Sequence, residues 1–218
     1  MMRVSTGVSG LDYLLRGGLM AGRAYLVYGD PGTGKTTLGL HFLTGEPGSA
    51  LLITFGQAKE LIHADAASIG LDTGKVAILD FSPPAETFSD LQNYDIFSPS
   101  EVEREPISRQ ISQTIEEKNP QRIFVDSFGY FLNLAGDAFQ RRRLAQSFFR
   151  FATRRNATLI VAADERECAR DADGVIHLEN GVEGRSVRIT KLRGSDFHPG
   201  HHPMRLTSEG LQIPLSAA

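Results

Sequence analysis

A loop suited to binding phosphate lies between residues 29 and 36, where the sequence fits Gly-x-x-x-x-Gly-Lys-Thr. Its glycines let backbone N–H groups turn inward as an anion-binding nest, which a Cβ atom would hinder. The lysine can reach the β- and γ-phosphates of a nucleotide, and the threonine hydroxyl can ligate Mg²⁺. A glycine-rich turn can match this pattern by accident, but an apolar run before it and helical spacing after it favour nucleotide binding. The expected contact residues are Gly29, Asp30, Pro31, Gly32, Thr33, Gly34, Lys35, Thr36 and Thr37.

An acidic residue follows a second apolar run, Arg122-Ile-Phe-Val-Asp126. Ligands of open α/β sheets lie at the carboxyl ends of the strands, so Asp126 is placed to hold Mg²⁺ together with Thr36. The alternative is an ordinary aspartate that caps a turn at the end of its strand. Given the phosphate loop, we favour the metal role.

The order of apolar runs predicts the elements that must position these residues. Near-continuous apolar runs at 50–55 and 158–163 indicate strands buried on both faces, and 76–79 indicates a shorter strand. Segments with helical spacing lie between them. The last third contains only strands, at 175–178, 187–192, 204–206 and 211–213, the last pair forming a hairpin. This pattern predicts one α/β domain over residues 1–218, with a mainly parallel sheet, helices on both faces and a C-terminal antiparallel extension.

The helices carry weaker signals. Ser9 is expected to cap a short first helix, and a helix is expected over 57–69. Residues 81–105 have several prolines and little periodicity, which predicts a long surface loop. Isoleucines at 107, 111 and 115 indicate a helix that ends at Asn119-Pro120. Asp137 is expected to cap a helix to about Arg155, and the residues expected on its core face are Phe139, Leu144, Phe148, Phe151 and Ala152.

Composition sets broad limits. The 218 residues have a formal net charge of −3, so nothing in the overall balance favours nucleic acid or an acidic membrane. One cysteine, Cys168, excludes an internal disulfide and suits a reducing compartment. No apolar run approaches the ~20 residues of a membrane span. We therefore expect a cytoplasmic protein without a membrane partner.

Several short motifs together resemble a single KaiC-type domain of the RecA superfamily, the KaiC/RadA group. They cover nearly the whole chain and are specific in combination. They are Ser5-Thr6-Gly7 with Leu11-Asp12, Gly17-Gly18-Leu19 with Gly22-Arg23, the phosphate loop, Phe55, Asp126-Ser127, and Lys191-Leu192-Arg193-Gly194 followed by Gly200, Pro203 and Gly210. The resemblance implies a RecA-type P-loop fold that binds ATP with Mg²⁺ and forms oligomers, hexameric rings above all, with nucleotide at the subunit interfaces.

The resemblance also implies a role for Lys191 and Arg193, which resemble residues that reach the γ-phosphate of a neighbouring subunit. Their spacing agrees with this role, since side chains two apart on a strand share one face. The alternative is a basic strand face in solvent.

One departure concerns hydrolysis. Members of this group carry two adjacent glutamates after the strand at 50–55, and at least one positions and activates water, whereas this chain has Gly56 and Gln57. A glutamine can orient water but cannot take its proton, and losing such a group commonly costs ~10²–10⁴ in rate. Glu60 is one helical turn further on, and Asp164 and Glu165 follow another strand, so these are alternative acids. Gly56 is expected to have a positive φ.

These features predict an ATP-binding, nucleotide-dependent oligomer with a regulatory or scaffold role, read by a protein partner, and with slow or absent hydrolysis. One alternative is an active ATPase using Gln57, Glu60 or Asp164. Another is a recombinase-like DNA-binding protein, for which the run Arg141–Arg143 is the main support, although a solvated helix face explains that run better. The histidines at 198, 201 and 202 are interpreted as a polar loop rather than a zinc site, and Cys168 as structural.

Overall fold

The computed structural model describes residues 2–83, 99–182 and 184–214. Within them, nine strands form one sheet in the order β11-β10-β9-β8-β3-β7-β6-β4-β5. The six strands from β8 to β5 run parallel to their neighbours. They are β3 (Ala24–Tyr28), β4 (Ala50–Thr54), β5 (Val76–Asp80), β6 (Arg122–Asp126), β7 (Thr158–Ala163) and β8 (Gly174–Gly181). Their carboxyl ends therefore share one edge of the sheet.

The remaining strands of this sheet are antiparallel to one another and to β8. They are β9 (Gly184–Leu192), β10 (His202–Thr207) and β11 (Gly210–Gln212). A separate pair, β1 (Arg3–Val4) and β2 (Leu19–Met20), forms a small antiparallel sheet. The mainly parallel sheet with an antiparallel C-terminal part confirms the fold predicted from the sequence.

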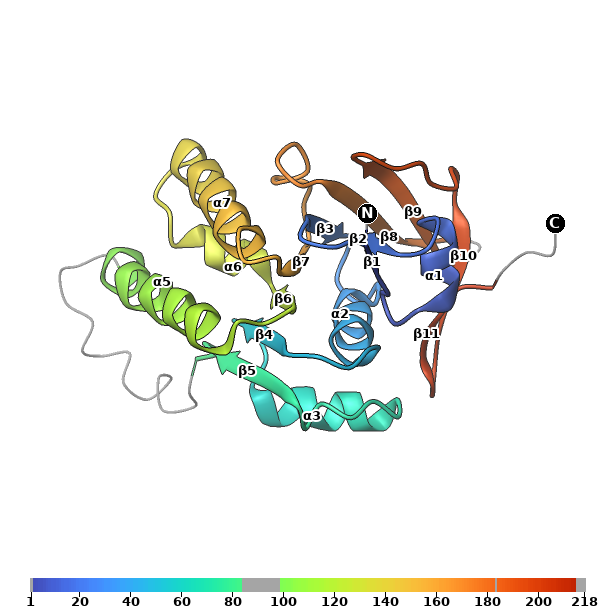
Figure 1. Ribbon diagram of the computed structural model, residues 1–218, viewed down its shortest axis with the longest axis horizontal. Coiled ribbons are helices and arrows are strands. Elements are labelled where there is room, and N and C mark those ends of the chain that lie inside the picture. Colours follow the sequence, from blue (N-terminus) through green and yellow to red (C-terminus); the bar gives the residue numbers. More distant parts are fainter. Residues whose placement is uncertain (1, 84–98, 183, 215–218) are drawn as a thin grey trace.

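Helices cover both faces of the sheet, with α2 and α3 on one side and α5, α6 and α7 on the other (Figure 1). They are α1 (Ser9–Leu14), α2 (Lys35–Thr44), α3 (Lys59–Ser68), α5 (Pro99–Lys118), α6 (Phe128–Asn133) and α7 (Ala138–Thr153). Among these described helices, none is both long and apolar enough to cross a bilayer.

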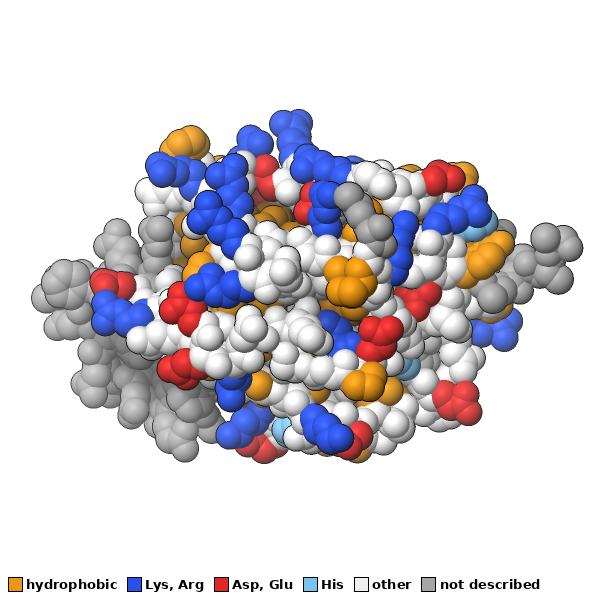
Figure 2. All heavy atoms as spheres, in the orientation of Figure 1, with side chains coloured by type: hydrophobic (Ala, Val, Ile, Leu, Met, Phe, Trp, Pro, Cys, Tyr) orange, Lys and Arg blue, Asp and Glu red, His pale blue; other side chains and the backbone are white. Residues whose placement is uncertain are grey.

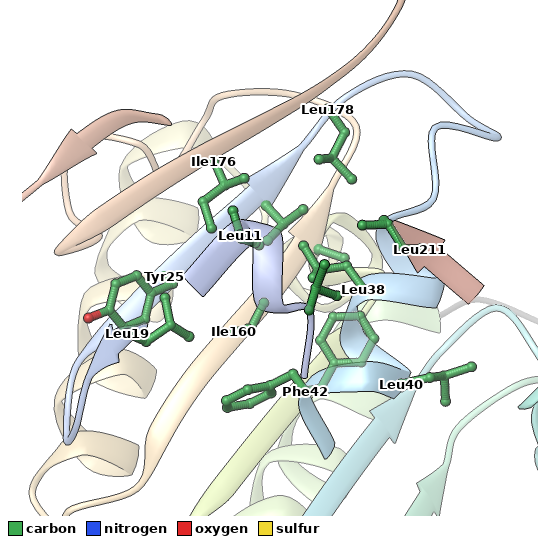
Figure 3. Packing of buried hydrophobic residues seen from close by; sticks show 14 of the residues in the cluster. Leu11, Leu19, Tyr25, Leu38, Leu40, Phe42, Ile160, Ile176, Leu178 and Leu211 are labelled. Atoms are coloured by element: carbon green, nitrogen blue, oxygen red, sulfur yellow. The ribbon is translucent and has the colours of Figure 1, made fainter. Parts of the chain in front are cut away.

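The core has two layers, one on each face of the sheet, because alternate strand residues point to opposite faces. In β3, Tyr25 and Val27 pack with α1 and α2, whereas Leu26 packs on the other face. Figure 3 shows side chains of the first layer converging from β3, α2, β7 and β8, with Tyr25, Leu38, Ile160 and Ile176 among them. The second layer is rich in aromatic rings from α6 and α7, including Phe128, Phe131 and Phe148. Packing in these two layers holds the strand ends in place, and the polar residues of the site lie at those ends.

The structure corrects several expected boundaries. The first helix is preceded by Val8 as its N-cap, and no side chain caps it, so the expected Ser9 cap is wrong. Helix α5 begins at Pro99, so the end of the expected surface loop is helical, while residues 84–98 lie outside the described residues. Proline is tolerated in a first helical turn, which explains how a proline-containing stretch can start a helix. Helix α3 begins at Lys59 rather than at residue 57.

Helix α7 is capped as expected, because the Asp137 carboxylate accepts a hydrogen bond of 2.8 Å from the Gln140 N–H. Its core face differs in one residue. Phe148 and Ala152 are buried, but the Phe139 side chain is 69% exposed. Phe139 lies in the first turn of α7, one position after the helix begins, where the Arg143 guanidinium covers its ring at 5.7 Å.

Candidate nucleotide site

The phosphate loop joins β3, which is buried throughout, to the first turn of α2. Gly32 and Gly34 have φ values of +80° and +101°, a backbone conformation that favours glycine. A Cβ atom at Gly32 would meet nothing within 4 Å on its own chain, so the loop is open there. Gly34 is the N-cap of α2 and offers no capping side chain, which leaves the first N–H groups of the helix available to an anion.

Lys35 is held over this loop although it is charged and only 9% exposed. Its Nζ donates to the carbonyl oxygens of Gly29 and Asp30 at 2.6 and 3.0 Å. It also forms an ion pair of 2.9 Å with Asp164 Oδ1, at the carboxyl end of β7. The ammonium group therefore lies inside the loop, where a nucleotide phosphate would compete with Asp164 for it.

Thr36 and Asp126 meet at the expected metal position. The Thr36 hydroxyl donates to Asp126 Oδ2 at 2.6 Å, which joins the start of α2 to the end of β6. Burial raises the pKa of the Asp126 carboxyl, while the Thr36 hydrogen bond and the Lys35 charge act in the opposite direction. A buried carboxylate beside a hydroxyl supplies hard oxygen ligands, so these residues fit Mg²⁺.

Lys191 and Arg193 share one face, as their spacing predicts, but both contact their own chain. Lys191 Nζ donates to the carbonyl oxygens of Ala169, Arg170 and Ala172 at 3.0, 3.0 and 2.5 Å. Arg193 donates to the Arg170 carbonyl at 3.3 Å and lies 3.8 Å from Asp173 Oδ1. Burial, together with the Arg193 charge, lowers the pKa of Lys191. A contact with a neighbouring subunit would require Lys191 to leave these carbonyl groups.

Comparison with known proteins identifies the family. A family model described as "ATPase: KaiC" matches residues 4–217. The chain belongs to the KaiC ATPase family. It is 30% identical over 242 residues to the circadian clock oscillator protein KaiC of Parathermosynechococcus lividus, with 97% of this chain and 42% of that protein covered. It is also 30% identical over 246 residues to the protein of the same description from Synechococcus elongatus, with 99% and 45% covered.

The chain thus spans less than half the length of the curated KaiC proteins that it matches. Family membership establishes a KaiC-like ATPase domain of the RecA superfamily. The activities and assemblies of those longer proteins come to this chain only as proposals.

The positions where the KaiC resemblance leads one to expect glutamates lie after β4. The Thr54 hydroxyl closes this turn by donating to the Gln57 carbonyl at 2.8 Å. The Gln57 side chain turns toward α3, where its Nε2 donates to Asp65 Oδ2 at 2.6 Å. Gly56 does not have a positive φ, so the expectation of a positive φ at this position is wrong. A Cβ there would meet only Tyr130 Cε2, at 3.8 Å.

The three alternative hydrolytic residues differ in their contacts. The Glu60 side chain is 72% exposed, and its ion-pair partner, at 3.9 Å, is Lys59 rather than Lys35. Gln57 is bound to Asp65, as described above. Asp164 alone among these three contacts Lys35. Geometry thus favours Asp164 over Glu60 as an acid near a bound phosphate.

Sequence reasoning missed a second group of side chains around the loop. Tyr28 stacks on His177 with ring centroids 4.3 Å apart, and Arg166 lies over the Tyr28 ring at 5.6 Å. Arg185 Nη2 lies 3.5 Å from the Gly32 carbonyl oxygen. Tyr28, Arg166 and His177 lie near the carboxyl ends of three adjacent strands, β3, β7 and β8. That position in the sequence could have identified them as residues near the site.

The other sequence motifs have local partners. Arg141 and Arg142 form ion pairs with Glu167 and Asp171 at 4.0 and 3.3 Å. The histidines of the 198–202 segment contact different groups, His198 stacking on Tyr13 and His201 lying 3.3 Å from Glu179. Within the described ranges, no group of three or more His, Cys, Asp or Glu side chains is arranged to hold a metal ion. Burial raises the pKa of the Cys168 thiol to about 12, which makes it unreactive at neutral pH.

Proposed function

We propose that the chain binds ATP with Mg²⁺ at the loop between β3 and α2. The observation that carries this proposal is the convergence of Lys35, Thr36 and Asp126. Lys35 and the open backbone around Gly32 would hold the phosphates, and Thr36 with Asp126 would hold the metal. Mg²⁺, when bound, neutralises charge on the β- and γ-phosphates. The contact set is Gly29 to Thr37, as predicted from the sequence.

A calorimetric titration with ATP and Mg²⁺ tests this proposal. Lys35→Ala should abolish binding, because it removes the ammonium group that lies inside the loop. Lys59→Ala, also a lysine-to-alanine change but on the exposed start of α3, should leave affinity within about twofold, since a change of ~0.4 kcal/mol is the size of a weak surface effect. Equal ATP affinity in the wild type and in Lys35→Ala would contradict the assignment.

We further propose that the chain, as one domain over residues 1–218, acts as a nucleotide-dependent oligomer in the cytoplasm. A hexamer is the favoured size. In this proposal ATP stabilises one assembly state, and a protein partner recognises and binds that state. Family membership supports it, together with the shared face of Lys191 and Arg193. DNA should bind weakly at physiological salt, because the chain carries a net charge of −3 and phosphate contacts dominate such affinity.

Hydrolysis is proposed to be weak. Gly56 offers no side chain, and Gln57 is bound to Asp65 on α3. Neither residue can accept a proton from an attacking water. Turnover should therefore be well below the order of 1 s⁻¹ or more that is ordinary for enzymes.

A second candidate function, an active ATPase, is favoured by one contact, the 2.9 Å ion pair between Asp164 and Lys35. In this case the Asp164 carboxylate, released from Lys35 by a phosphate, accepts the proton of water. Asp164→Asn should then lower phosphate release by ~10²-fold or more. In the weakly hydrolysing protein the same change should instead tighten ATP binding, because it removes a negative charge beside the phosphate position. Glu165→Gln, the neighbouring exposed acid, is the matched control.

A further inference from the structure

Four arginines without an ion-pair partner among the described residues gather on one side of the molecule. Arg143 and Arg150 lie on α7, Arg154 follows as its C-cap, and Arg170 lies in the connection between β7 and β8. Figure 2 shows Lys and Arg side chains gathered over this region, above α7 and the nearby loop. The whole chain has a net charge of −3, so this concentration of positive charge is local.

The arginines line two adjoining cavities, which we call the arginine groove. The larger cavity, of about 600 Å³, is lined by Arg143, Gln146, Ser147, Arg150, Phe151, Arg154 and Arg155. The smaller one, of about 280 Å³, shares Gln146 and Arg150 and adds Arg170 and Arg193. Arg143, Arg150 and Arg154 are spaced i, i+7 and i+11, so they form one row along the helix. Their Cα atoms are separated by about 10 Å and about 6 Å along its axis.

This row brings like charges together on one side of the isolated chain. Like charges four residues apart on a helix face, as Arg150 and Arg154 are, repel one another. Such a pair costs a few tenths of a kcal/mol. The neighbouring arginines are neutralised, since Arg142 pairs with Asp171 and Arg155 pairs with Glu116 at 2.6 Å. Asp171 and Asp173 line the smaller cavity, but among the described residues no acidic side chain forms an ion pair with Arg143, Arg150, Arg154 or Arg170. Such a surface is complementary to a negatively charged partner.

The groove favours an acidic protein segment over a nucleic acid. Nucleic-acid single strands are bound by aromatic rings on which bases stack. Phe151, whose ring lines the larger cavity, has its ring face covered by the Arg155 guanidinium at 4.3 Å. The inner cavity also contains Asp171 and Asp173, which would repel a continuous phosphate backbone. Separate carboxylates can pair with Arg143 and Arg154, which line the larger cavity and not the smaller one, without meeting these two acids.

We propose that the arginine groove binds an acidic segment of a partner protein, a segment with several Asp or Glu side chains and an apolar anchor. The exposed part of Phe139, beside Arg143, is the contact for that anchor. The inference rests on the proposed function. It identifies the surface of this chain that would bind the partner which recognises the assembly. The groove itself is separate from the proposed nucleotide contacts, since Lys35, Thr36 and Asp126 lie outside both cavities.

The test is fluorescence anisotropy with a labelled peptide of about 16 residues, roughly half of them Asp or Glu and two of them Phe, at physiological salt. Changing Arg143, Arg150 and Arg154 together to Glu should weaken binding at least ~10-fold. The control changes Lys59, Lys75 and Arg205 to Glu, which alters the net charge equally at exposed positions elsewhere. It should weaken binding by no more than about threefold.

A set of neutral changes, Arg143→Gln, Arg150→Gln and Arg154→Gln, should give an intermediate loss and guards against misfolding of the Glu variant. Equal losses in the groove and control variants would overturn the proposal, because the attraction would then be nonspecific. Tighter binding of an oligothymidylate of about the same length, lost in the same groove variant, would assign the groove to nucleic acid instead. Lys35→Ala should keep peptide binding, so failure of ATP binding and failure of the groove are distinguishable.

Discussion

Gln57 is the residue at which the distinction between a switch and an enzyme can be tested most directly. Gln57→Glu is nearly isosteric and supplies a proton acceptor, but it places a second carboxylate beside Asp65, which now accepts the Gln57 hydrogen bond. Repulsion should turn the new side chain away from α3. We expect phosphate release to rise at least ~10-fold, equivalent to about 1.4 kcal/mol of barrier.

A phosphate-release assay measures this change, with Gln57→Asn as the control that keeps an amide. Gly56→Glu can be added, because Gly56 has room for a Cβ and no positive φ. If neither acid raises turnover, while ATP still binds, the rest of the hydrolytic site is incomplete and the chain is not simply a disabled ATPase.

His41 makes stability depend on pH. Its Nε2 accepts a hydrogen bond of 3.0 Å from the Leu211 N–H, so the buried ring must be neutral, and burial lowers its pKa below the ordinary 6.5. The folded protein therefore binds this proton less readily than the unfolded chain. The stabilising contribution is complete above pH 6.5 and is lost as the pH falls below that value.

Denaturant unfolding at pH 8 and at pH 5 measures this effect. The wild type should lose more free energy of unfolding on acidification than His41→Gln, whose side chain can still accept the Leu211 hydrogen bond. Burial also lowers the pKa of His177, so part of the pH dependence should survive in the variant. Identical losses in the two proteins would show that His41 does not titrate as described.

At the scale of elements, the close contact of α2 with β6 sets the position of the site. A Cβ at Gly39 would lie 2.1 Å from Phe124 Cε1, so only glycine allows this approach. Gly39→Ala should cost about 1–3 kcal/mol through overpacking, although alanine favours helix by about 1 kcal/mol. It should also weaken Mg²⁺-ATP binding, because α2 carries Thr36 and β6 carries Asp126.

Chemical denaturation and calorimetry measure the two effects, and Phe124→Leu supplies the control. Combined with Gly39→Ala, it should recover part of both losses, because the smaller side chain makes room for the added methyl group. A double variant that loses as much as the sum of the single changes would show that this contact does not transmit the effect.

The sequence predicted the elements with strong periodicity and missed those defined by long-range contacts. The buried strands and the phosphate loop were evident from apolar runs and glycines. Strands β1 and β2 have two residues each, too few for any period, and pair only because the chain returns between them. Helix α6 lies between Asp126 and Asp137, where apolar residues without clear spacing gave no signal.

The candidate site divides in the same way. Residue types and order predicted Lys35, Thr36 and Asp126, because each has a fixed place in its motif. The contacts of Lys191 could not be predicted, since its acceptors are backbone carbonyl groups at 169–172, which any residue type presents. The ion pair between Asp164 and Lys35 depends on the parallel pairing of β3 with β7, which brings the two strand ends together.

At the scale of the whole molecule, assembly should depend on nucleotide. Lys191 must give up three carbonyl groups of its own chain before it can reach a neighbour, so a strong acceptor such as a phosphate is needed to draw it away. Light scattering should show a larger particle with a non-hydrolysable ATP analogue than without it. Lys191→Ala should reduce this difference, and Arg205→Ala, an exposed arginine on β10, should not. A monomer at all concentrations, in both conditions, would exclude a role across subunits.

The strand order has a consequence for how such a chain can be altered. The phosphate loop follows β3, Asp164 follows β7, Asp126 ends β6, and the Gly56-Gln57 turn follows β4, the next strand along. Each of these four strands thus places one part of the candidate site at the same edge of the sheet. In the proposed function, residues 56 and 57 govern turnover without touching Lys35, Thr36 or Asp126, so hydrolysis and nucleotide binding would change independently. Under that proposal, substitutions in one loop would switch hydrolysis off or on while the order and pairing of the strands stay the same.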